Sequence, residues 1–122
     1  MYRGVLIRES LVGGLSALDC LHIVDTRIID ISSPAAGQPA EWTVLTFEVD
    51  DGQAAASAQA LADDLAPGPW YVDFNNGERS YVVFSQRVFT YVRGDAVTLR
   101  AAQAHARERG IPESQIDWAV PS

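Results

Sequence analysis

The residues of this chain best suited to metal binding or proton transfer are two histidines and one cysteine. Cys20 and His22 are two positions apart, so in a strand they would share one face, as two zinc ligands can. A tetrahedral site needs further ligands, and His105 is the only other histidine. We therefore predict no metal site. Cys20 is expected to be a small buried hydrophobic residue, and His105 to pack within a helix rather than to act as a general base.

Other candidate catalytic spacings also fall short of a known signature. Residues 14–18 approach a nucleophile elbow around Ser16, but Leu18 stands where the sharp strand-to-helix turn requires a small residue. The acidic pairs at 50–51 and 63–64 are adjacent in sequence, and adjacent side chains do not converge on a shared proton. All 9 cations are arginines, so neither Schiff-base catalysis nor a phosphate-loop lysine is available. We predict no cofactor and favour a binding protein over an enzyme.

Composition and charge predict a single domain over residues 1–122. Of the 122 residues 48% are hydrophobic and 20% are charged, which suits a domain with its own core. The net charge of −7 and the scattered arginines argue against nucleic-acid binding, which needs a basic surface. Arg8 and Glu9 end the first apolar run, so no signal peptide or membrane span is expected. A single cysteine allows no intrachain disulfide, and we therefore expect a cytoplasmic protein.

The pattern of apolar residues predicts six strands and two main helices. Strands are expected at 5–7, 22–31, 42–49, 70–74, 79–84 and 88–92. Helices are expected at 54–65, capped by Asp50 or Asp51, and at 96–109, capped by Asp95, with a weaker helix at 11–18. This order predicts an α+β two-layer sandwich with a mostly antiparallel sheet and both main helices on one face. A ferredoxin-like core with added strands is the preferred topology.

Residues 70–92 are predicted to form a three-stranded meander with two apolar faces. Asn76-Gly77 suits a type I′ turn and Gln86-Arg87 a second tight turn, which would place Asp73 opposite Ser80. One face then carries Tyr71, Asp73, Ser80, Val82, Phe84, Phe89 and Tyr91. Because the helices would cover only the other face, we predict an aromatic binding surface that forms a homodimer or binds a small molecule or protein. Alternatively, the N-terminal segment or the C-terminal tail with Trp118 covers it.

Asp73 is the one charged residue in the middle of a predicted aromatic strand. A carboxylate in such a place is costly unless it is hydrogen-bonded, with Tyr91, Ser80 or Arg93 as partners, or unless it serves a pocket. If Asp73 is structural, Asp73→Asn should destabilise the fold by about 1 to 3 kcal/mol. If Asp73 is functional, the same change should be nearly neutral or stabilising.

Several segments resemble a family of small bacterial proteins of about this length whose function is uncharacterised. These segments are YRGVLI at 2–7, WYVDF at 70–74, VVF at 82–84 together with VF at 88–89, and GIPESQ at 110–115. The resemblance implies a compact bacterial domain and transfers no activity or catalytic residue. The residues themselves favour a non-catalytic binding or interaction module that acts through the aromatic sheet face. The alternative is a small cofactor-independent enzyme of the dimeric α+β barrel type, with a pocket around Asp73 as acid or base.

Overall fold

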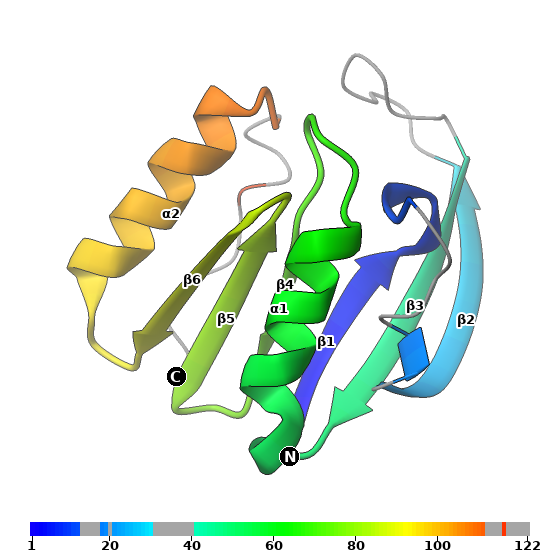
Figure 1. Cartoon of the computed structure of the whole chain (residues 1–122), viewed down its shortest axis with the longest axis horizontal. Helices are drawn as coiled ribbons and strands as arrows, with labels where there is room; N and C mark the ends of the chain where they lie inside the picture. Colours follow the sequence, from blue (N-terminus) through cyan, green and yellow to red (C-terminus); the bar gives the residue numbers. More distant parts are fainter. Residues whose placement is uncertain (13–17, 20, 31–40, 112–115, 117–122) are drawn as a thin grey trace.

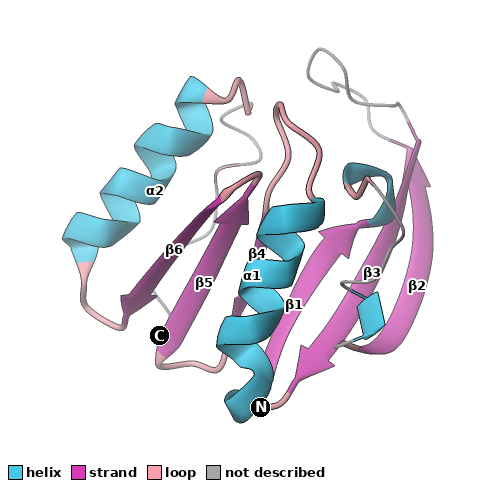
Figure 2. Cartoon of the chain, viewed as in Figure 1, coloured by secondary structure: helices cyan, strands magenta, loops and turns pink. Residues whose placement is uncertain are grey.

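The computed structural model describes residues 1–12, 18–19, 21–30, 41–111 and 116, and these form one six-stranded sheet with two helices. The strands are β1 (Tyr2–Ile7), β2 (His22–Asp30), β3 (Glu41–Val49), β4 (Val72–Asn75), β5 (Arg79–Phe84) and β6 (Arg87–Val92). The helices are α1 (Ala54–Asp64) and α2 (Ala96–Glu108), with short 3-10 helices η1 (Arg8–Ser10) and η3 (Asp51–Gln53) (Figure 2). The predicted α+β class and the six strands are confirmed, each strand end lying within a few residues of its predicted position.

The strand order puts the first three strands on one side of the sheet and the last three on the other. The sheet runs β2-β3-β1-β4-β5-β6, and every neighbouring pair is antiparallel. In the first four strands β1 lies between β3 and β4, which is the ferredoxin-like order, and β5 and β6 are the added strands. The predicted helix at 11–18 is not seen at its start, because Leu11 forms a β-bridge with Leu65; residues 13–17 lie outside the described residues.

The two helices lie on opposite faces of the sheet, so the prediction that both cover one face is wrong. Helix α1 buries Ala58 and Leu61 in a cluster with Val83 of β5. Helix α2 buries Ala102 and Ala106 in a separate cluster with Val82. Successive side chains of a strand point to opposite faces, so Val82 and Val83 mark the two sides. Figure 1 shows α1 in front of the central strands and α2 beside β6.

The two predicted helix caps have different outcomes. Asp95 caps α2 as predicted, since its carboxylate accepts a hydrogen bond from the Thr98 N–H at 3.1 Å. The predicted cap of α1 is wrong, because Gln53 occupies the cap position without a side-chain bond. Asp51 instead pairs with the N-terminal amine of Met1.

The meander has the predicted faces but a different register. Asp73 lies opposite Val82 rather than Ser80, a shift of two positions that leaves each side chain on its predicted face. The type I′ turn is absent because only Gly77, not Asn76, has positive φ. The Asn76 carboxamide oxygen accepts bonds from the N–H groups of Glu78 and Arg79 at 2.9 and 2.8 Å, which lengthens the loop. The second turn lies one residue earlier than predicted, at residues 85–86. Gln86 there has a φ of 63°, and the Gln86 N–H donates a hydrogen bond to the Ala62 carbonyl at 2.9 Å.

Candidate functional site

Most of the predicted aromatic binding surface lies in the protein core. Ser80, Val82, Phe84, Phe89 and Tyr91 are all buried. Helix α2 supplies Ala102 and Ala106 to this second core cluster, and Ile111 and Ile116 complete it. These five residues therefore form no exposed surface in the single chain, and the apolar area from which a homodimer was predicted is already covered. Ile116, in the C-terminal segment, belongs to this cluster, which agrees with the alternative that the tail folds over this face.

The same sheet face is open farther along, over β4, β1, β3 and β2. Val5 of β1 pairs with Thr46 of β3 on one side and with Asp73 of β4 on the other, so these three side chains form one row across the sheet. Ile7 and Val44 pair in the next row. Three adjoining hollows share Val5, whose residue is 43% exposed. We call this surface the sheet groove; it is lined by Arg3, Val5, Ile7, Asp25, Arg27, Ile29, Trp42, Val44, Thr46, Tyr71, Asp73 and Asn75.

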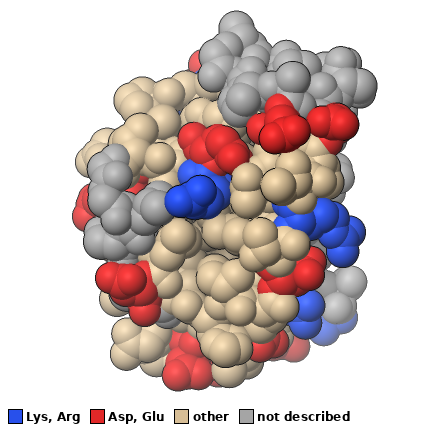
Figure 3. All heavy atoms as spheres, turned by 90° about the vertical axis from the view of Figure 1, so that its right-hand side faces the viewer, with Lys and Arg blue, Asp and Glu red and all other residues tan. Residues whose placement is uncertain are grey.

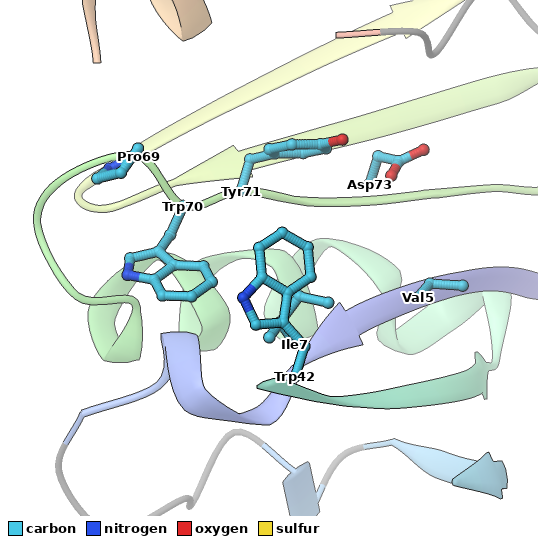
Figure 4. A pocket seen from close by; sticks show the side chains of 7 residues that line it. All are labelled: Val5, Ile7, Trp42, Pro69, Trp70, Tyr71 and Asp73. Carbon is cyan, nitrogen blue, oxygen red and sulfur yellow. The ribbon is translucent and has the colours of Figure 1, made fainter. Parts of the chain in front are cut away.

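One end of the sheet groove deepens into an aromatic pocket of about 180 Å³, lined by Val5, Ile7, Trp42, Pro69, Trp70, Tyr71 and Asp73 (Figure 4). The Trp42 and Trp70 rings lie 5.8 Å apart at 52° and are nearly buried. Figure 4 shows Tyr71 and Asp73 extending from one side of the segment 70–73 and Trp70 from the other. Trp42 points up from the start of β3 toward Tyr71. The pocket thus combines aromatic walls with one carboxylate.

Asp73 and Tyr71 are the two predicted site residues that the structure brings together at a cavity. Both are half-buried, and the Tyr71 ring also lies 6.4 Å from Phe84 of the second core cluster. The pKa of the neighbouring Tyr91 hydroxyl is raised above its usual value, mainly by burial and further by the negative charge of Asp73. A hydrogen bond with Ser80 opposes this shift. Asp73 therefore lines the pocket, and its negative charge also acts on the core beside it.

Sequence reasoning missed the other pocket residues. Alternation along β3 does place Trp42 on the same face as Val44 and Thr46, which is the available signal. The preferred ferredoxin-like topology implies that β1 separates β3 from β4, but no residue spacing in the sequence shows that this order brings Trp42 and Ile7 to Tyr71.

His105 occupies a second candidate position, against the second core cluster. Its ring lies 4.6 Å from that of Phe84 and 5.6 Å from that of Phe89, and Arg109 Nε donates to its Nε2 at 3.3 Å. The pKa of His105 is lowered by burial first, then by the positive charges of Arg109 and Arg87, while Glu108 opposes the shift. The neutral, half-buried ring fits the predicted packing role.

This lowered pKa predicts a stability loss on mild acidification. Between the folded pKa and the higher unfolded one, the unfolded chain binds more protons, so stability falls as the pH drops through that window. We expect urea denaturation to show a smaller loss for His105→Gln than for the wild type between about pH 7.5 and about pH 5.5. The matched control is His22→Gln, which removes the other histidine at an exposed position of β2. An unchanged pH dependence in His105→Gln would contradict this account.

The other residues considered as metal ligands or as a nucleophile form no site within the described residues. His22 is exposed on β2, whereas Ser16, Cys20 and Trp118 lie outside the described residues. Within the described part of the chain, no group of three or more histidine, cysteine or acidic residues is placed to hold a metal ion.

Comparison with family models, with curated proteins and with solved structures finds no match to this chain. The resemblance of the sequence to a family of small bacterial proteins therefore stays a prediction. None of the helices described by the structure is long and apolar enough to cross a membrane.

Proposed function

We propose that this chain is a non-catalytic binding module whose aromatic pocket receives an arginine side chain of a protein partner. The observation that supports this most strongly is the placement of Asp73 beside Tyr71 and Trp42 around one cavity. A guanidinium group stacks on aromatic faces and donates paired hydrogen bonds to a carboxylate, so it satisfies both parts of this lining. In keeping with the single cysteine, we place the module in the cytoplasm.

The size of the pocket favours a side chain over a complete cofactor. Its volume is about 180 Å³, whereas sites for drug-sized ligands usually measure about 300–1,000 Å³. The sheet groove continues from the pocket past Val5 and Thr46, and this gives room for the chain on either side of a bound residue.

The charge of the molecule supports a basic partner. The net charge is −7, and Figure 3 shows acidic residues spread over the side that it draws, with basic residues close to several of them. Such a field attracts cationic proteins and speeds their association, while it disfavours nucleic acid.

The enzymatic alternative would depend on Asp73 and Tyr71 as acid and base. The other pocket-lining residues are apolar or tryptophan, so they add no nucleophile to this pair. The binding proposal needs no further group, and we prefer it for that reason.

Tryptophan fluorescence tests the proposal directly, because two of the three tryptophans line the pocket. We expect N-acetylarginine methylamide to give a saturable change with a Kd of about 1 mM, as suits a single small side chain. Asp73→Asn should weaken this binding about tenfold, because a charge-assisted hydrogen bond is lost, and should leave the fold stable.

The matched variant is Asp63→Asn, which changes an exposed carboxylate on α1 that is not part of the pocket lining, and should bind as the wild type does. The matched probe is N-acetylleucine methylamide, which should bind more weakly. Equal affinity for the two probes, or equal affinity of Asp73→Asn and wild type for the arginine probe, would overturn the proposal.

A further inference from the structure

Strand β2 presents a long and exposed edge of the sheet. Within the described residues it pairs with β3 alone, and the four residues 25–28 are all exposed. Val24 and Ile28 are 40% and 64% exposed, which is unusual for large aliphatic side chains. A free edge has unpaired backbone N–H and C=O groups that can pair with another strand.

The edge also carries features that prevent indiscriminate pairing. A β-bulge interrupts the register between Ile23 and Asp25, and charged side chains follow at Asp25 and Arg27. These two side chains already form an exposed ion pair within the chain, with Arg27 Nη2 at 3.5 Å from Asp25 Oδ2. Bulges and charges on an edge strand exclude partners whose charges do not match.

The order of residues in β2 is complementary to itself. Reading outward from Thr26, Asp25 precedes it and Arg27 follows it, and the exposed Val24 and Ile28 lie one position farther on each side. An antiparallel copy centred on Thr26 would therefore place each Asp25 opposite an Arg27, with the exposed Ile28 side chains just outside these pairs. Opposite charges in directly paired positions stabilise a strand pair, and like charges destabilise it.

From this complementarity we propose that a second copy of the chain pairs with the first through β2, antiparallel and with Thr26 on the two-fold axis. The sheet then continues from one copy into the other, and Arg27 and Asp25, which line one end of the sheet groove, come to lie near the axis. The grooves of the two copies become neighbours on one continuous face. In Figure 3, whose view faces the β2 side, basic and acidic residues lie close together.

This interface differs from the aromatic face first predicted to form a homodimer. It uses residues that the single chain leaves exposed, whereas Val82 and Phe84 are buried beneath α2. A contact made by a single strand from each copy is small, so we expect a reversible dimer that dissociates on dilution.

Reversing the charge at Asp25 or at Arg27 tests the proposed pairing, because two variants that each fail to pair alone should pair with each other. Asp25→Arg makes both positions basic, and Arg27→Asp makes both acidic, so each variant alone places like charges opposite each other. Sedimentation at about 100 μM should then show wild-type dimer but monomer for either variant alone. Mixing the two variants in equal amounts should restore a dimer with one copy of each, which native mass spectrometry identifies by its mass.

The matched controls are Glu78→Arg and Arg93→Asp, which reverse an exposed ion pair with an Arg93 Nη1 to Glu78 Oε1 distance of 3.6 Å, outside β2. Both should remain dimeric. Circular dichroism of all four variants separates loss of pairing from loss of folding, and the rescue by mixing requires folded chains. A monomeric wild type, a dimer that persists in Asp25→Arg, or a mixture that stays monomeric would overturn the proposal.

Discussion

Phe84→Ala is expected to lower the free energy of unfolding by about 3–5 kcal/mol, because it empties a fully buried site in the second core cluster. The Phe84 ring lies 5.8 Å from that of Phe89 and 4.6 Å from that of His105, so its removal leaves a cavity between β5 and α2. Denaturant titration measures this loss. The size of the loss distinguishes the observed fold, in which α2 covers this face of the sheet, from a fold in which the face is exposed. In the second case Phe84→Ala would change the free energy of unfolding little.

The control for this substitution is Val97→Ala on α2, whose residue is 76% exposed. Its effect should stay within about 0.5 kcal/mol, as is usual for surface positions. If Phe84→Ala were equally mild, the placement of α2 over the Val82 and Phe84 side of the sheet would be wrong.

Gly4→Ala is expected to destabilise the protein by about 1–3 kcal/mol or more, through overpacking between β1 and β4. A Cβ atom at this position would lie 2.4 Å from both the Asp73 carbonyl oxygen and the Phe74 Cβ. The backbone of β4 would have to move away, and the Phe47 and Phe74 rings, 5.6 Å apart, would have to repack. Since β4 also carries Asp73, the aromatic pocket should change with it.

Gly52→Ala provides the comparison, because a Cβ at Gly52 would have nothing within 4 Å. Thermal melts should show Gly52→Ala unchanged or slightly stabilised, since alanine restricts the unfolded chain. A Gly4→Ala protein as stable as Gly52→Ala would show that β1 and β4 are not packed as closely as described.

The sequence predicted the strands and helices well because their signals are local. Alternation in residues 42–49, the apolar stripe of residues 54–65 and the Asp95 cap each act within a few residues. The faces of the meander were also predicted correctly, although both turns were placed incorrectly. A shift of two positions changes each residue's partner and not its side, so the error in register did not alter the faces.

The side of the sheet on which α2 packs could not be predicted from such local signals. Both faces of β5 are apolar, with Val82 and Phe84 on one and Tyr81 and Val83 on the other, so either could accept a helix. Because both helices were expected on one face, the second face was predicted to be exposed, and a homodimer was predicted to cover it. The observed helix covers that face over β5 and β6, and the open part lies farther along, over β1 and β3.

The candidate site was predicted in part for the same reason. Tyr71 and Asp73 belong to the meander and could be placed on one face by alternation alone. Trp42 and Val5 reach them only through the strand order, which depends on contacts between residues far apart in sequence. Long-range pairing of this kind leaves no local pattern.

Chemical-shift mapping by NMR tests the central claim, that the aromatic pocket binds an arginine side chain, most directly. Titration with N-acetylarginine methylamide should move the signals of Val5, Ile7, Tyr71 and Asp73 and the indole N–H of Trp42 most strongly, to a common saturation point. The signals of Ala102 in α2 should stay in place. Shifts spread evenly over the acidic surface, or concentrated on α2, would contradict the account.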